Sequence, residues 1–146
     1  MSTTKKQGTD PSGQDKVLTF HPMPFIQGRY VLVLNDGELD EVCREYEILP
    51  RHFDVMEGWG QHVYLSHKDK GLLSVVRMDV AGMDALDKEK GSTDLPGRLA
   101  VLVHECMHVV QRWQEFVGES EPGKEFQAYF LEEVFRNLAT DYLARS

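Results

Sequence analysis

The sequence is poor in three features that define large classes of proteins: cysteine, long apolar runs and positive charge. Only two cysteines occur, Cys43 and Cys106, so we exclude a disulfide-stapled secreted scaffold and expect reduced thiols in a cytosol. Apolar runs such as residues 99–103 are far too short to span a bilayer. We therefore expect a water-soluble, intracellular protein.

Positive charge is scarce as well: 16 Lys and Arg stand against 24 Asp and Glu, which gives a net charge of −8. A surface of that sign repels phosphates, so we expect no nucleic-acid partner and no anionic membrane partner. The sequence also lacks a Gly-rich phosphate loop and a G-x-S-x-G motif. Nucleotide hydrolysis and serine esterase chemistry are therefore excluded from the candidate functions.

The chain divides into a polar opening segment and one longer unit. Residues 1–16 are polar and lack an apolar central region, so we expect a disordered tail rather than a secretory signal. Residues 17–146 carry enough apolar side chains, within a total of 41%, to form the core of a single domain.

The residue pattern in the first part of this domain is typical of strands, and the pattern in its last third is typical of helices. Asp94 is expected to cap a helix that begins near Pro96, and Gly118 is expected to end it. A second helix should follow the loop at 119–123. Strands are predicted at 17–20, 29–34, 62–66 and 72–78, the last two as an antiparallel hairpin, with a short helix at 38–48 and a loop with one helical turn at 80–94.

Both long helices show an apolar stripe at three- and four-residue spacing. We therefore predict an α+β domain, in which a small, mainly antiparallel sheet is packed by a C-terminal pair of long helices. The first stripe comprises Leu99, Leu102, Val103, Cys106, Val109, Val110, Trp113, Phe116 and Val117; the second comprises Phe126, Tyr129, Phe130, Val134, Phe135, Leu138 and Leu143.

The first of these helices carries the motif His104-Glu105-Cys106-Met107-His108, an H-E-x-x-H pattern. Residues four apart lie one turn apart on one face of a helix, so both imidazoles can reach one ion, while Glu105 can take a proton from water beside it. The composition of this chain predicts only about 0.02 such matches by chance. The alternative is a pair of surface histidines beside an incidental glutamate.

A catalytic zinc needs a third protein ligand and an open position. Glu125 is the candidate, because it begins the second helix seventeen residues after His108. Glu119, Glu121 and Glu132 are the alternatives, and Glu125 could instead only favour the helix dipole. Cys106 lies on the apolar stripe and is expected to be a packed thiol rather than a ligand.

The segments LVHECMHVVQ and EFQAYFLE resemble the zincin metallopeptidases in their gluzincin form, and resemble more closely small proteins of tailed bacteriophages and prophages. Those proteins carry H-E-x-x-H-V-x-Q and then E-x-x-A-Y. The resemblance covers about residues 99–132. It implies a zincin-like core, with His104, His108 and Glu125 as zinc ligands and Glu105 as general base.

Two departures from the thermolysin-like pattern are visible. The interval between His108 and Glu125 is shorter, and Tyr129 stands where those enzymes have an aspartate. The Tyr129 hydroxyl is a candidate to orient a ligand or stabilise an oxyanion, with simple core packing as the alternative.

In zincins the substrate lies along an edge strand of the sheet, which would here be 62–66 or 72–78. His62, Tyr64 and His67 would then be candidate transition-state donors, although such residues more often reflect only the polar alternation of a half-exposed strand. Trp59 is expected either to line a pocket or to anchor its loop.

These observations favour a zinc-dependent hydrolase, specifically a small metallopeptidase acting on a peptide or protein substrate. The alternative is a non-catalytic zinc-binding protein of a phage, with a role in structure, assembly or interaction with virion or host proteins. In either case we expect it in the cytoplasm, which is the host cytoplasm for a phage protein, or associated with the virion.

Overall fold

A four-stranded mixed sheet with long helices on one face organises the chain. The computed structural model describes residues 18–117 and 123–146, so the predicted tail at 1–16 lies outside the described residues. The elements are β1 (His21–Pro22), β2 (Gly28–Val33), α1 (Asp36–Tyr46), the 3₁₀ turn η2 (Pro50–His52), β3 (Gly60–His67), β4 (Gly71–Met78), α2 (Val80–Lys90), α3 (Leu95–Val117) and α4 (Lys124–Arg145). The predicted α+β class is confirmed.

The strand order is β1-β2-β4-β3, with β2 and β4 parallel and the other two pairs antiparallel. The predicted hairpin is confirmed as β3 and β4, in which His62 pairs with Val76. Among the described residues β3 lies at an edge of the sheet, whereas β4 lies between β2 and β3 and is almost entirely buried. Of the two strands considered for substrate binding, only the one containing residues 62–66 therefore has a free edge.

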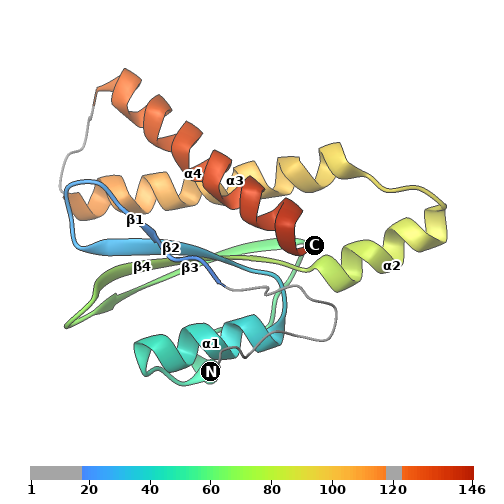
Figure 1. Ribbon diagram of the computed structural model, residues 1–146, viewed down its shortest axis with the longest axis horizontal. Coiled ribbons are helices and arrows are strands. Elements are labelled where there is room, and N and C mark those ends of the chain that lie inside the picture. Colours follow the sequence, from blue (N-terminus) through green and yellow to red (C-terminus); the bar gives the residue numbers. More distant parts are fainter. Residues whose placement is uncertain (1–17, 118–122) are drawn as a thin grey trace, which may run out of the picture.

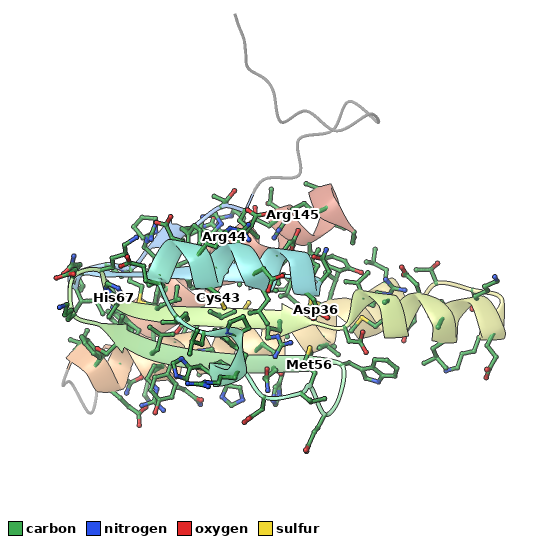
Figure 2. The ribbon with its side chains drawn as sticks, turned by 90° about the horizontal axis from the view of Figure 1, so that it is seen from below. Asp36, Cys43, Arg44, Met56, His67 and Arg145 are labelled. Atoms are coloured by element: carbon green, nitrogen blue, oxygen red, sulfur yellow. The ribbon has the colours of Figure 1, made fainter. Side chains whose placement is uncertain are left out.

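The helices lie on both faces of the sheet. α3 and α4 cross one face, and α1 lies against the other (Figure 1). Figure 2 shows the α1 face, where Asp36 begins the helix and Arg44 lies in its last turn. Arg145, at the end of α4, reaches across to Glu38 of α1 in an ion pair of 2.8 Å. Two apolar clusters, one on each face, form the core.

The predicted stripes of the two long helices are largely confirmed. Leu102, Cys106, Val109, Val110 and Trp113 of α3 are buried, as are Phe130, Val134 and Leu138 of α4. Both stripes were predicted to include too many residues, because a period of 3.6 residues per turn directs the outermost positions of each stripe away from the core. The exposed members are Val103, Phe116, Tyr129 and Leu143, and Tyr142 is buried in place of Leu143.

Two predicted elements differ from the structure. The region 80–94, predicted to be a loop with a helical turn, contains the eleven-residue helix α2. Its start is fixed by Asp79, whose side chain accepts from Gly82 N at 3.0 Å, and its end by Gly91 at φ 79°. The first strand lies at His21–Pro22 rather than at 17–20.

The end of α3 agrees with the prediction as far as it can be followed. Its last residue is Val117, and the predicted terminator Gly118 lies outside the described residues. None of the helices in the described part of the chain is both long and apolar enough to cross a membrane.

Candidate metal centre

Helix α3 places the H-E-x-x-H residues on a face that the core does not use. Its start is capped as predicted, since Asp94 Oδ1 accepts from Gly97 N at 3.0 Å. The buried side of α3 packs against the sheet and α4. His104 is exposed because it lies outside that buried side, and His108 follows one turn later.

The two imidazoles already have the spacing of a chelating pair. The Nε2 atoms of His104 and His108 lie 3.3 Å apart, and their ring planes are inclined by 81°. Two nitrogen ligands at 2.0–2.1 Å from a tetrahedral zinc ion are separated by about 3.3–3.4 Å. The side chains therefore fit one metal ion without rearrangement of the helix.

A glutamine one turn further along orients the second histidine. Gln111 Oε1 lies 3.1 Å from His108 Nδ1. An amide oxygen accepts from the ring N–H at Nδ1, and this leaves the lone pair of His108 Nε2 available to a metal. Gln111 is the glutamine of the H-V-x-Q pattern, and that pattern alone does not indicate this contact.

Glu105 completes the group. Among the described residues, His104, Glu105 and His108 form a set of potential ligand side chains whose donor atoms all lie within 4.8 Å of one another. Glu105 is only 7% exposed, and burial raises the pKa of its carboxyl group, against the opposing effect of the two histidines. A raised carboxyl pKa brings this group closer to the range useful for proton transfer.

The start of β3 lies directly against Glu105. A Cβ atom placed on Gly60 would lie 2.7 Å from Val101 Cγ1 and 3.1 Å from Glu105 Oε2. A residue with a Cβ atom would force these side chains to shift, so glycine allows the edge strand to approach the metal helix closely. Nothing in the local sequence pattern around Gly60 indicated this contact.

Of the predicted transition-state residues, His62 lies beside the histidine pair, and Tyr64 lies next to His62 under the guanidinium of Arg112. The His62 ring is stacked 6.0 Å from that of His108 and 6.2 Å from that of Tyr64. His62 Nε2 shares a hydrogen bond of 3.0 Å with Ser74 Oγ. Burial, with smaller effects of His108 and Arg112, lowers the pKa of His62 to about 4.

His67 lies elsewhere, at the far end of β3. Its Nδ1 accepts from Asp69 N and Lys70 N, at 3.1 and 3.0 Å, and its ring packs edge-on against Tyr46. These contacts make His67 a turn and packing residue, remote from the histidine pair.

Helix α4 contacts a different side of α3 from β3. Phe126 stacks on Trp113 at 5.4 Å, and Gln127 donates to Gln114 at 3.2 Å, whereas His108 faces the edge strand. Glu125, in the first turn of α4, is exposed and does not belong to the group around the histidines. Its role as third ligand stays a prediction.

The other candidates on and near α4 are placed as follows. Glu132 is exposed and pairs with Arg136 at 3.2 Å, while Glu119 and Glu121 lie outside the described residues. Tyr129 is 65% exposed, so its interpretation as a core residue is wrong.

An open depression lies in front of the metal group. It measures about 400 Å³ and is lined by Trp59, Gly60, Ala100, Val101, His104 and Glu105. Trp59 therefore lines a hollow, which was one of its two expected roles. The depression leaves room for a ligand beside the first histidine and the glutamate, as a catalytic site requires.

The cysteines do not contribute to this group. Both are free and buried, and burial raises the pKa of Cys106 to about 12, so its thiol stays protonated and packs in the core.

No protein-family model matches the chain, and searches of the curated proteins and of the solved structures found no match either.

Proposed function

We propose that the protein is a zinc-dependent hydrolase, and specifically a metallopeptidase. The observation that carries the proposal is the 3.3 Å separation of His104 Nε2 and His108 Nε2 on one face of α3, beside the buried carboxylate of Glu105. Imidazole donors in this arrangement suit zinc. Glu125 remains the predicted third ligand.

In this proposal, His104 and His108 hold the metal ion, and Glu105 transfers a proton. Bound zinc supplies Lewis acidity, which polarises a carbonyl group and lowers the pKa of water. Glu105 then accepts the proton of the attacking water and delivers it to the leaving amine. His62 and Tyr64 lie on the adjacent strand, from which they are proposed to stabilise the developing oxyanion.

The edge strand supplies a means of holding an extended peptide. β3 begins at Gly60, which lies against Glu105, and its residue His62 lies beside His108. One edge of β3 pairs with β4, and the opposite edge is unpaired among the described residues. An extended substrate that adds to the free edge of β3 would place a peptide bond near the histidine pair. This geometry favours a peptide over a compact small molecule as the substrate.

A zinc-binding protein without turnover is the competing function, and the open depression at His104 and Glu105 favours catalysis over it. Structural zinc sites have four protein ligands, whereas catalytic sites keep one position open.

The first experiment measures zinc per chain by elemental mass spectrometry and cleavage of a peptide library by the same preparation. We expect about one zinc per chain in the wild type, by analogy with mononuclear sites, and a loss in His104→Ala and His108→Ala. His67→Ala is the matched control, since His67 lies at the far end of β3. Glu105→Gln should retain zinc and lose cleavage. Full activity in Glu105→Gln would show that Glu105 is not the general base. Unchanged zinc binding in both histidine variants would show that His104 and His108 do not hold the zinc ion.

A further inference from the structure

A second, smaller pocket shares walls with the depression at the metal group. It has a volume of about 110 Å³ and lies between the segment before β3, helix α2 and the first half of α3. Trp59 and Val101 line both hollows. The pocket therefore adjoins the candidate active site on the side of α2.

The shared walls are held in place by close packing. A Cβ atom on Gly82, in the first turn of α2, would lie 3.0 Å from Trp59 Cζ3, and the Trp59 carbonyl accepts from Asp79 N at 3.0 Å. Val101 precedes Glu105 by one turn of α3, so both side chains lie on the same face of that helix. The pocket thus lies one turn of α3 before the proposed base, and its Trp59 wall is held against α2.

The charged side chains at the pocket are held by hydrogen bonds, although Arg98 Nε is buried without a partner among the described residues. Arg98 is only 8% exposed; its guanidinium donates to Tyr142 Oη at 3.0 Å, to Asp84 at 2.8 Å and to Asp87 at 2.5 Å. Asp94 accepts the capping hydrogen bond of α3 from Gly97 N. The surface left for a ligand is formed by the apolar side chains of Trp59, Met83, Leu86 and Val101.

We propose that this pocket binds an aliphatic side chain of leucine or methionine size, carried by the substrate residue next to the scissile bond. The inference rests on the proposed metallopeptidase function. The volume argues against an aromatic ring, since a dry apolar cavity that binds benzene measures about 150 Å³. The carboxylates of Asp87 and Asp94 in the lining disfavour an acidic side chain.

The test uses protein freed of metal by a chelator, so that it depends neither on the metal group nor on turnover. N-acetyl-leucine N-methylamide is titrated into isotope-labelled protein while the indole N–H signals of Trp59 and Trp113 are recorded. Trp113 is the internal reference, because it is buried and donates to Pro24 O at 2.8 Å. We expect a saturable shift of the Trp59 signal only. The alanine analogue should bind about tenfold more weakly or worse, because it buries three fewer carbon atoms, and the phenylalanine and glutamate analogues should also bind more weakly.

A pair of variants on α2 assigns the binding to this pocket. Leu86 lines the pocket but not the depression at His104, so Leu86→Phe should fill the pocket and abolish the Trp59 shift. Ala85→Phe adds the same ring at the exposed neighbouring position and should leave the shift intact. An unchanged Trp113 signal shows that each variant is folded.

Three results would overturn the pocket assignment: no Trp59 shift with the leucine compound, an undiminished shift in Leu86→Phe, or tighter binding of the phenylalanine or glutamate analogue. Failure of the proposed function has a different signature. In that case the Trp59 shift persists, whereas the zinc and cleavage measurements on the same protein are negative.

Discussion

The imidazole rings of His62 on β3 and His108 on α3 lie nearly parallel, with 20° between their planes and 6.0 Å between their centroids. The edge strand thereby places an uncharged imidazole beside the metal helix, since burial lowers the pKa of His62 to about 4. Ser74, on the neighbouring strand β4, fixes the ring through a hydrogen bond of 3.0 Å. When Nε2 accepts from the Ser74 hydroxyl, the neutral ring carries its proton on Nδ1, and this N–H can donate to an oxyanion.

This relationship predicts the effect of removing the His62 ring. In His62→Ala we expect kcat to fall by about 10²–10³, the usual cost of losing an oxyanion donor, while zinc per chain stays at the wild-type value. The measurements are single-turnover peptide cleavage and elemental analysis of the same preparation. Loss of zinc together with activity would show instead that His62 is a metal ligand.

The predicted third ligand can be tested with two carboxylates of one helix. Glu125 and Glu132 are both exposed residues of α4. If Glu125 is a ligand, Glu125→Gln should weaken zinc binding at least tenfold, which corresponds to about 1.4 kcal/mol, and Glu132→Gln should not. Competition with a chromophoric chelator gives both affinities. Equal zinc affinities in the two variants would exclude Glu125 from the metal site.

The sequence predicted the elements whose signal is periodic. The apolar residues at three- and four-residue spacing located α3 and α4, the polar segment at 67–71 located the hairpin, and the i, i+4 spacing of His104 and His108 located the metal group. Each of these features is local, and a local pattern is sufficient to specify it.

The features that the sequence did not predict depend on contacts between distant segments. The position of β3 at the edge follows from the parallel pairing of β2 with β4, and no local pattern encodes which strands become neighbours. The approach of Gly60 to Glu105 joins residues 45 positions apart. The length of α2 was missed because its apolar residues do not form a clear stripe at helical spacing and only Met83 is buried. Its caps, Asp79 and Gly91, were the available signal.

Gln111 provides a test of how the second histidine is oriented. Because its Oε1 lies 3.1 Å from His108 Nδ1, Gln111→Ala should weaken zinc binding about 10–100-fold, the usual effect of losing such an outer partner. Gln111→Glu retains an acceptor oxygen and should restore most of the affinity. The same chelator competition measures both variants. An unaltered zinc affinity in Gln111→Ala would mean that the glutamine is only a surface residue.

Gly60 makes the closest approach between the edge strand and the metal helix, and it can be tested by adding one methyl group. Gly60→Ala would place Cβ 2.7 Å from Val101 Cγ1 and 3.1 Å from Glu105 Oε2, so β3 or the side chains of Val101 and Glu105 must move. We expect a loss of about 1–3 kcal/mol in the free energy of unfolding, the usual cost of overpacking, measured by urea denaturation. Peptide cleavage should fall as well, because the base is displaced. Gly123→Ala is the matched control, since its Cβ would meet no atom of the described residues within 4 Å and its φ of −53° suits any residue. Equal unfolding midpoints in the two variants would show that β3 does not press against the metal helix at Gly60.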